Sequence, residues 1–584
     1  MRKTKYNPDT SLWVERKNKW LAMGIELEDM IKPKIAVVNT SAGSEPGSYR
    51  NLDELSRIVQ QAILDAGALP FEVRTKPLDN PAVSARMKMG HPMLARDLLA
   101  KEIQDLIEGA FLEGMVCISS DDTDISAHLI AAARINIPAI ILTSGSQTAA
   151  LCETSRLDDQ FFEITNAYDE LASLASEWNP RENYVNMPQT SVMTTGARSG
   201  LSMAISMQLA AEALGMTLPG NSAVRATEKR LWEFARWAGE TIVKLTLDNC
   251  LPSDILTAKA FENAIMVMLA AGGSIGTAQH LSAIAAATGQ PLDVLSMFER
   301  LSPLTAIRSN GASLAEVFEG GSGTAALMTR LRDSLNLDSM TVNQVTLGET
   351  IAGFGVNDGD TILPLQTPLN TRPPIVILQG SLAPDGALIR LSALPPGCER
   401  IAGPARVFTS EYSAVEAVRK GDVRKGDVII LWSLDPERGV DRPLPLSLPA
   451  ALHGSGLAET VAVVTDGQLS GLDQTIVAAF VMPDATSGGP LAVVLEGDWI
   501  VLDFIGLRIL LDIPDEEMHV RLSSWQAFHR VFHQPNEVSP PELVLEPCWR
   551  RAVLDEPYQP SGASIHGRLN ARQAADMLRF YHLY

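Results

Sequence analysis

Several features that define common protein classes are scarce in this sequence. Its 584 residues include only five cysteines, which are scattered and form no CxxC pair, so neither a disulfide framework nor a zinc site is indicated. No apolar run approaches the ~18 residues that a membrane span requires, and no apolar segment follows the basic amino terminus as in a secretory signal. We therefore expect a soluble protein of the cytoplasm, with no membrane as a partner.

Basic residues are also fewer than acidic residues. Lys and Arg number 48 against 69 Asp and Glu, which gives a formal net charge of -21 at pH 7. Because binding to phosphate backbones needs a clustered basic surface, nucleic acid is not expected as a partner.

The length implies more than one domain, since a single hydrophobic core stops growing at about 250–300 residues. In the first part of the chain, strand-like apolar runs at residues 35–39 and 69–73 flank a segment with helical spacing at residues 52–66. This alternation predicts an α/β domain with a mostly parallel sheet over residues 34–365, preceded by a helical arm at residues 1–33.

The pattern changes near the proline-containing residues 363–368. Beyond them, turns and short strands follow one another at short spacing, which is typical of a β-rich, barrel-like domain. We assign this domain to residues 370–538 and expect residues 539–584 to form a tail that packs on the core.

A loop with three aspartates follows the apolar run at residues 114–118. Asp121, Asp122 and Asp124 stand where a strand should end and a helix should begin. Ligands bind at the carboxyl ends of parallel strands, and clustered carboxylates can hold a divalent cation. A solvated turn with an aspartate as helix cap explains the same residues, and we favour it from the sequence alone. Cys117, inside the apolar run, is expected to be a buried small side chain.

The most informative stretch is TDGQLSG at residues 465–471. The β-branched run at residues 461–464 predicts a buried strand that ends in a tight turn and presents the hydroxyl of Ser470. Glycines on either side, including Gly471, let the backbone approach a ligand closely. Taken alone, however, the heptapeptide fits an ordinary hairpin turn better.

Two further motifs follow, PDATSGGP at residues 483–490 and GDWIVLD at residues 497–503. In this order the three resemble the family of dihydroxy-acid, sugar-acid and phosphogluconate dehydratases, and earlier segments such as EALGMTLPG and GGSIG fit the same family. The resemblance runs from residue 35 to residue 521. It implies that Ser470 is an alkoxide base that removes the proton α to a substrate carboxylate, and that the chain forms a homodimer or homotetramer.

The family's metal ligands can be compared position by position. Its members dehydrate with an iron–sulfur cluster held by three cysteines, and the matching positions here are Gly47, Asp121 and Arg198. Thr123 replaces a carbamylated lysine that helps to hold magnesium, whereas the aspartate before it is retained as Asp122. We therefore expect no iron–sulfur cluster, while Mg2+ held by Asp122 and Asp121 stays an open alternative.

Two arginines add charge where ligands are missing. Arg198 takes the place of the third cysteine, and Arg225 stands where the family has proline. Because guanidinium groups bind carboxylates in a bidentate manner, we hypothesise that Arg198 and Arg225 clamp a small anionic substrate. Alternatively, Arg198 pairs with Asp121 or Asp122 and fills the emptied pocket.

Two functions agree with these observations. The first is an enzyme that acts on a small hydroxy acid or sugar acid by Ser470-dependent α-proton chemistry without a cluster, although the sequence does not identify the group that would activate Ser470. The second is a non-catalytic relative, either a ligand-binding protein or a partner subunit of an active dehydratase. The retained Ser470 turn favours the first function, and the missing ligands favour the second.

Overall fold

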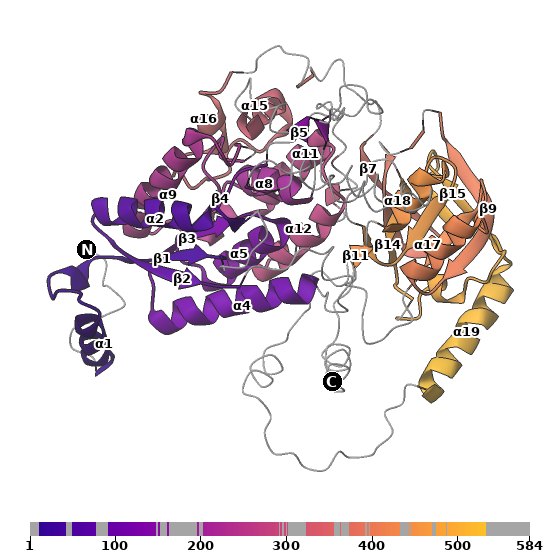
Figure 1. Cartoon of the computed structure of the whole chain (residues 1–584), viewed down its shortest axis with the longest axis horizontal. Coiled ribbons are helices and arrows are strands. Elements are labelled where there is room, and N and C mark those ends of the chain that lie inside the picture. The colour runs from indigo at the N-terminus through magenta and orange to yellow at the C-terminus, as the bar shows by residue number, and fades with distance from the viewer. Residues whose placement is uncertain are drawn as a thin grey trace, which may run out of the picture.

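The computed structural model arranges the chain as two bodies side by side, an α/β body from the first part of the sequence and a barrel from the last part (Figure 1). The structure describes residues 11–41, 49–76, 92–147, 150–151, 161–162, 195–197, 203–222, 224–290, 292–294, 297–298, 301, 323–355, 362–363, 373–391, 394–395, 397–432, 443–444, 447–469, 475–485 and 487–532.

A four-stranded parallel sheet forms the centre of the first body. Its order is β2-β1-β3-β4, with β1 at Lys34–Asn39, β2 at Leu69–Arg74, β3 at Gly114–Ser119 and β4 at Ala139–Thr143. β1 and β3 are buried along their whole length because helices cover both faces of the sheet, so these strands are almost entirely apolar. The predicted α/β domain with a parallel sheet is confirmed.

Helices cover the two faces of this sheet. α2 (Leu52–Asp65) packs against α9 (Lys229–Asp248) on one face, and α4 (Pro92–Ala110) packs against α5 (Asp122–Ile135) on the other (Figure 1). The α2–α9 approach is close because Gly239 has no side chain: a Cβ there would lie 2.8 Å from the carbonyl oxygen of Val59.

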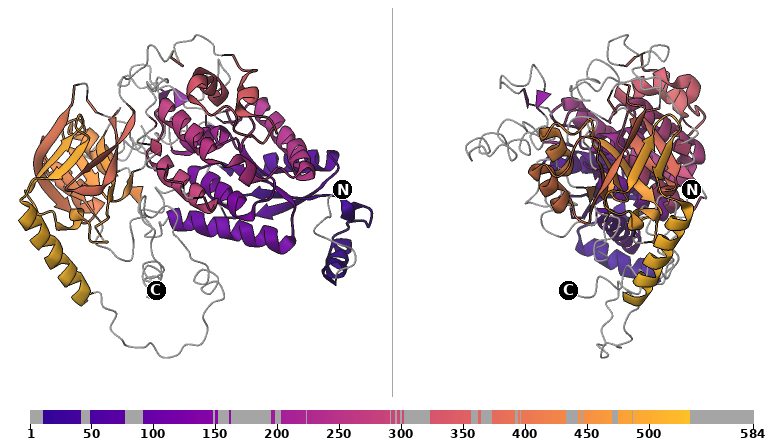
Figure 2. Two further views of the ribbon diagram at one scale, coloured as in Figure 1. Left: turned by 180° about the vertical axis from the view of Figure 1, so that it is seen from behind. Right: turned by 90° about the vertical axis from the view of Figure 1, so that its right-hand side faces the viewer.

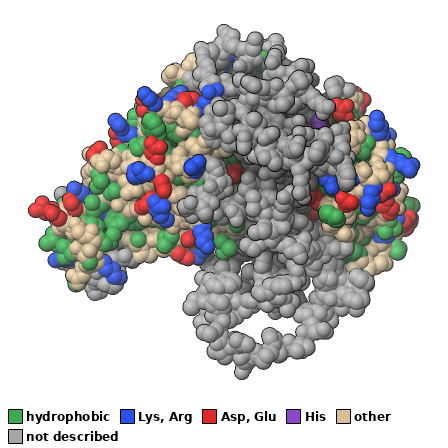
Figure 3. Space-filling view, in the orientation of Figure 1, with side chains coloured by type: hydrophobic (Ala, Val, Ile, Leu, Met, Phe, Trp, Pro, Cys, Tyr) green, Lys and Arg blue, Asp and Glu red, His purple; other side chains and the backbone are tan. Residues whose placement is uncertain are grey.

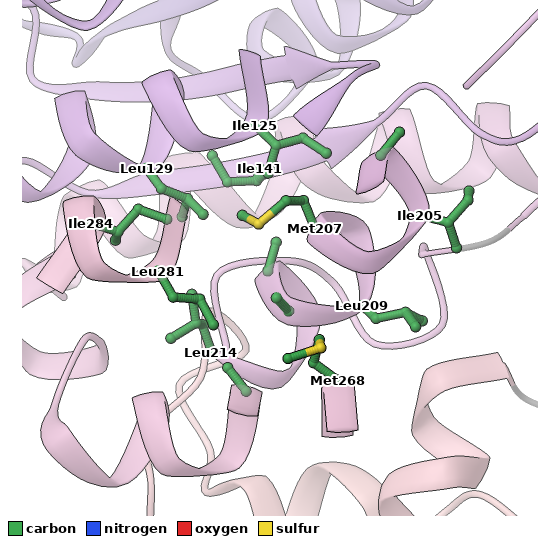
Figure 4. Close-up of a cluster of buried hydrophobic side chains, with 14 of the residues drawn as sticks. Ile125, Leu129, Ile141, Ile205, Met207, Leu209, Leu214, Met268, Leu281 and Ile284 are labelled. Atoms are coloured by element: carbon green, nitrogen blue, oxygen red, sulfur yellow. The ribbon is translucent and has the colours of Figure 1, made fainter. Parts of the chain in front are cut away.

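A further group of helices packs next to α5. They are α8 (Met203–Ala213), α10 (Pro252–Ile255), α11 (Ala258–Ala271), α12 (Gly276–Ala287), α15 (Gly323–Arg330) and α16 (Leu347–Ile351). Met207 and Met268 are fully buried among leucine and isoleucine side chains in this region (Figure 4). Thr257 caps α11 by accepting a hydrogen bond from the N–H of Ala260.

The loop after α8 is held by a buried carboxyl group. Glu212 accepts hydrogen bonds from the backbone N–H groups of Gly220, at 2.8 Å, and Ser222, at 3.0 Å. Burial raises the pKa of Glu212 to about 7, although these donors and Arg230 act in the opposite direction. The loop fixed in this way leads directly to Arg225.

The second body is a closed barrel of eight strands (Figures 1 and 2). Its order is β10-β12-β14-β8-β7-β16-β15-β9, and β9, β10, β12 and β14 run parallel to one another. The strands are β7 Ile375–Gly380, β8 Ala383–Arg390, β9 Arg400–Phe408, β10 Val428–Leu431, β12 Ala462–Thr465, β14 Ile476–Met482, β15 Trp499–Asp503 and β16 Arg508–Leu511. The predicted barrel-like domain is confirmed.

Helices accompany the barrel on its outside. α17 (Glu411–Lys420) contacts β9 and β10, α18 (Ser447–Gly454) packs on α17, and α19 (Asp515–Phe532) follows the last strand (Figure 2). The short elements are η3 Arg332–Ser334, β5 Ala150–Leu151, β6 Phe161–Phe162, β11 Pro443–Leu444, β13 Gln468–Leu469 and η5 Pro490–Val493.

Side chains of the parallel barrel strands alternate between two hydrophobic cores. Ile430 and Val464 belong to the core inside the barrel, whereas Ile429 and Val463 belong to the core that includes residues of α17 and α18. Because both faces are buried, these strands carry unbroken apolar runs in the sequence.

The amino-terminal arm contains α1 (Ser11–Ala22) and a 3-10 turn, η1 (Asp29–Ile31). The ammonium group of Lys34 lies 4.9 Å from the centre of the Trp20 ring, which is buried against Met30. The predicted tail at residues 539–584 lies outside the described residues, and the domain boundaries stay predictions. Among the helices that the structure describes, none has the length and apolarity to cross a bilayer. On the face shown in Figure 3, basic and acidic side chains are interspersed over the described surface.

Candidate functional site

The carboxyl ends of β1, β3 and β4 bring several predicted site segments to one edge of the sheet. Directly after β4, Ser146 forms parallel bridges with both Ala197 and Arg225. Arg225 therefore lies on one side of Ser146, and the residue before Arg198 lies on the other. The placement of Arg198 itself is outside the described residues, so the clamp formed by Arg198 and Arg225 stays a prediction.

The aspartate loop between β3 and α5 is built around helix capping. Asp121 is the N-cap of α5, and Asp124 completes a capping box by accepting the backbone N–H of Asp121 at 2.7 Å. Asp124 also accepts the N–H of Ser120 at 2.9 Å, and burial raises its pKa well above the usual value. The helix-cap alternative is confirmed for Asp121, but the loop is not the solvated turn we expected, because Asp122 and Asp124 are buried.

Asp122 points instead to a polar chain that links three helices. His280 of α12 lies with Nε2 3.1 Å from Oδ2 of Asp122, and its Nδ1 lies 2.9 Å from the hydroxyl of Ser126 and 3.4 Å from Nη1 of Arg96. Arg96, from α4, is fully buried and forms an ion pair with Asp97 at 2.9 Å. This series of polar contacts therefore extends from an ion pair in α4, through His280, to the Asp122 carboxyl group.

The chemistry of His280 fixes its role in this chain. Burial and, next, Arg96 lower its pKa to about 3, so the ring is neutral near pH 7 and carries one N–H. Because a carboxylate only accepts hydrogen bonds, the hydrogen is on Nε2 and faces Asp122. His280 is therefore a packed, hydrogen-bonded residue that orients Asp122.

A second buried histidine joins the ends of β1 and β3. His128 lies 3.1 Å from the hydroxyl of Thr40 and 2.6 Å from the hydroxyl of Ser119, and burial lowers its pKa to about 3. Two buried polar atoms at the same edge, Oδ1 of Asn39 and Oγ of Ser144, have no hydrogen-bond partner. A buried polar atom without a partner lowers the stability of the fold unless a ligand or water forms a hydrogen bond with it. This edge of the sheet can therefore accept hydrogen bonds from, or donate them to, a polar ligand.

On the barrel, the 465–471 turn begins where β12 ends. Ser470 and Gly471 lie outside the described residues, but Asp466 is buried and accepts the N–H of Ala485 at 2.9 Å. Burial, together with the nearby carboxyl group of Asp484, raises the pKa of Asp466 to about 7 against the effect of the backbone donor. The first two dehydratase-like motifs therefore meet at Asp466.

The third motif has a structural task. Asp498 accepts the N–H of Leu495 at 2.8 Å and Nη2 of Arg521 at 3.1 Å, so it closes a turn and fastens α19 to the barrel. Arg521 also pairs with Glu517 one helical turn earlier. The Asp498 carboxyl group of the GDWIVLD motif therefore has a structural task in the barrel.

The donors that a metal site requires are not gathered in the described part of the chain. Cys117 is enclosed in β3, where burial raises its pKa and the prediction of a buried small side chain is confirmed, while Cys250 follows α9 and Cys398 belongs to the barrel. Within the described ranges, no three His, Cys, Asp or Glu residues are grouped for a metal ion. Asp122 offers a single carboxylate, and one of its oxygens already accepts from His280. These residues do not fit an iron–sulfur cluster, nor do they alone form a magnesium cage.

The protein thus has two parts. The first is a parallel α/β sheet with polar groups at its carboxyl edge, and the second is a barrel with a buried acid at the ends of its parallel strands. Proteins of this kind bind small molecules at the ends of strands. Two family models match this chain in succession. The one described as dihydroxy-acid/6-phosphogluconate dehydratase N-terminal matches residues 32–350, and its C-terminal counterpart matches residues 360–540.

Relatives of nearly the same length support this match. Proteins named dihydroxy-acid dehydratase from Methanococcoides burtonii and Caldicellulosiruptor bescii are 33% and 34% identical over 507 and 506 residues, covering 86% of this chain and 91% of each relative. A third, from Acetivibrio thermocellus, is 34% identical over 512 residues, or 87% of this chain and 91% of the relative. The chain belongs to the dihydroxy-acid/6-phosphogluconate dehydratase family.

Proposed function

We propose that this protein acts on a small hydroxy acid or sugar acid by chemistry at the carbon next to the carboxylate, with Ser470 as the base and without an iron–sulfur cluster. The names of the relatives support the substrate class. The observation that carries the proposal is the 2.9 Å hydrogen bond from the N–H of Ala485 to Asp466, because it joins two motif loops at the carboxyl ends of parallel strands. An ordinary hairpin turn would not require the second loop.

The substrate carboxylate is assigned to Arg225 and Arg198. The position of Arg225 beside Ser146, with Ala197 on the other side, supports this assignment. A guanidinium group there would stabilise the negative charge that spreads onto the carboxylate when Ser470 removes the α-proton. Ser470 still needs an activating group, since a serine hydroxyl is a weak base at neutral pH.

The absence of a cluster is proposed from the donors themselves. The three positions that match the family's cysteines hold Gly47, Asp121 and Arg198, none of which supplies a thiolate. Asp121 is also occupied as the N-cap of α5. Metal analysis of protein purified without oxygen tests this point: stoichiometric iron and acid-labile sulfide would contradict it. Magnesium measured in the same sample tests the alternative that Asp122 and Asp121 hold Mg2+.

A non-catalytic relative is the second candidate. The conversion of a ligand position into a helix cap at Asp121 favours it, because that aspartate now stabilises α5 whether or not a reaction occurs. Under this hypothesis the protein binds a hydroxy acid or joins an active dehydratase as a partner subunit. In the second case the protein would form a mixed assembly with the active dehydratase instead of the expected homodimer or homotetramer. Light scattering measures the mass of the assembly and so distinguishes the two.

Exchange of the α-proton with solvent separates the two candidates. Glycerate and gluconate incubated with the protein in D2O would lose their Cα proton signal in the NMR spectrum if α-proton chemistry occurs. Ser470→Ala is expected to abolish exchange, and Arg198→Ala and Arg225→Ala to slow it by about 10²-fold or more, because each removes transition-state stabilisation. Ser455→Ala, at an exposed serine after α18, is the matched control. Exchange that survives in both Ser470→Ala and Arg198→Ala would refute the enzymatic role.

A further inference from the structure

The residues that directly follow two neighbouring barrel strands, β10 and β12, lie next to each other in the sheet register. β10 and β12 are parallel, with Ile430 opposite Val464 and Leu431 opposite Thr465. Ile430 and Val464 face the barrel interior. Trp432 and Asp466 are the next residues after this paired register. Trp432 belongs to the core inside the barrel, and Asp466 accepts the N–H of Ala485, which belongs to the same core.

Trp432 presents a hydrogen-bond donor without an acceptor. Its side chain is only 8% exposed and packs with the barrel core, yet its Nε1–H has no hydrogen-bond partner. A buried donor without a partner is destabilising, and native proteins retain few of them. If this side chain only filled the core, phenylalanine would do so equally well without a buried donor. The N–H therefore indicates that an acceptor binds there.

Asp466 presents a second donor at the same end of the barrel. It is 5% exposed, and its interactions are with backbone N–H groups and with the carboxyl group of Asp484, not with a cation. Burial without a cation favours the protonated form of a carboxyl group, which can donate a hydrogen bond. The rise in its pKa to about 7 agrees with this environment.

The loop that follows β14 contacts Asp466. Ala485 donates its N–H to Asp466, and both Ala485 and Leu491 belong to the core inside the barrel. Asp484 is oriented by Ser487, whose N–H and hydroxyl lie 2.8 Å and 2.6 Å from its two carboxyl oxygens. Buried polar groups of the two dehydratase-like motifs therefore lie together at this end of the barrel.

We propose that Trp432 Nε1–H and the Asp466 carboxyl group are paired hydrogen-bond donors for an oxygen of a bound hydroxy acid or sugar acid at this end of the barrel. The ligand class rests on the proposed function, and the two donors deepen it by naming barrel residues that hold the ligand. An oxygen-rich ligand matches two donors that converge from neighbouring strands, whereas a cation would be repelled by the indole N–H and receive at most one anionic group.

Conservative substitutions test the tryptophan directly. Trp432→Phe keeps the ring but removes the N–H, and Trp499→Phe is the matched control, because Trp499 is 47% exposed on β15. Binding of glycerate and gluconate to the full chain is measured by isothermal titration calorimetry, and the Tm is measured without ligand. We expect Trp432→Phe to weaken binding about 10-fold, the effect of one lost hydrogen bond, while the ligand-free Tm stays the same or rises.

The carboxyl group is tested in the same way by Asp466→Leu, with Asp385→Asn at an exposed position of β8 as control. We expect Asp466→Leu to weaken binding at least as much as Trp432→Phe. In the wild type, the indole N–H signal that Trp432→Phe removes should shift when gluconate is added, and the signal of Trp499 should not.

Four outcomes would decide the matter. Unchanged affinity in Trp432→Phe, or a lower ligand-free Tm, would show that the N–H does not serve the ligand and would overturn the inference. Affinity that falls in both barrel variants while Ser470→Ala still exchanges the α-proton would sustain the inference and refute the proposed catalytic role of Ser470. If the wild-type chain binds neither glycerate nor gluconate, the ligand class is wrong and both proposals fall. Weakened binding in both variants with exchange lost in Ser470→Ala supports both.

Discussion

Replacement of Asp97 by asparagine tests the buried ion pair that supports the sheet edge. Nε and Nη2 of Arg96 each lie 2.9 Å from Oδ1 of Asp97, and the arginine is fully buried. A neutral amide at this position would remove the negative charge that pairs with the guanidinium group, and removal of one partner of a buried pair costs about 3–5 kcal/mol. At about 2–4 °C for each kcal/mol in a domain of this size, we expect the Tm of the first unfolding transition to fall by roughly 10 °C.

Two comparisons make this prediction specific. The double variant Arg96→Met, Asp97→Leu removes both charges and is expected to recover most of the lost stability, because apolar residues of similar volume replace a buried pair at little cost. Asp105→Asn breaks a matched surface pair with Lys101, at 3.2 Å, and should change the free energy of unfolding by less than about 1 kcal/mol. Scanning calorimetry and urea unfolding measure these differences. An Asp97→Asn variant within about 1 kcal/mol of the wild type, or a double variant no more stable than the single one, would refute the reasoning.

Three further predictions concern pH, ligand capacity and packing. The pKa of Asp466 is raised from 3.8 to about 7 on folding, so its contribution to stability is complete below pH 4 and is lost as the pH rises to 7. Relative to Asp466→Asn, the free energy of unfolding of the wild type should fall by about 4 kcal/mol over this range. Parallel curves of unfolding free energy against pH for the two proteins would contradict the assignment. Ser144→Ala removes a buried hydroxyl without a partner, so urea unfolding should show equal or greater stability without ligand, and a clear loss would mean that the hydroxyl is already satisfied. Gly403→Ala would place a Cβ on the carbonyl oxygen of Gly426, and we expect a loss of about 1–3 kcal/mol or more in urea unfolding, with an unchanged midpoint as the contrary result.

Much of the fold was accessible from the sequence because burial leaves a periodic pattern. β1 and β12 are continuous apolar runs, and α2 has its apolar residues on one face. Each of these elements is determined by residues close together in the chain.

The candidate site was less accessible because its contacts are long-range. Arg96 and His280 meet across 184 residues, and the sequence around Arg96 does not indicate that this arginine is buried. Trp432 could be paired with Asp466 only once the register of β10 and β12 was known. Asp466 has a local signal in the sequence, because it is an acidic residue at the end of a strand-like apolar run. The roles of Ser470, Gly471, Arg198, Arg225, Asp121 and Asp122 stay predictions.

The helix cap at Asp121 also bears on the history of this protein. If an ancestor held a cluster through a cysteine at this position, the present aspartate has since taken over the first turn of α5. Asp121→Cys would remove a cap, at a cost of about 1 kcal/mol, before the ligands at Gly47 and Arg198 had been regained. A return to cluster chemistry would therefore begin with a loss of stability and no gain in function, which makes the departure from it difficult to reverse.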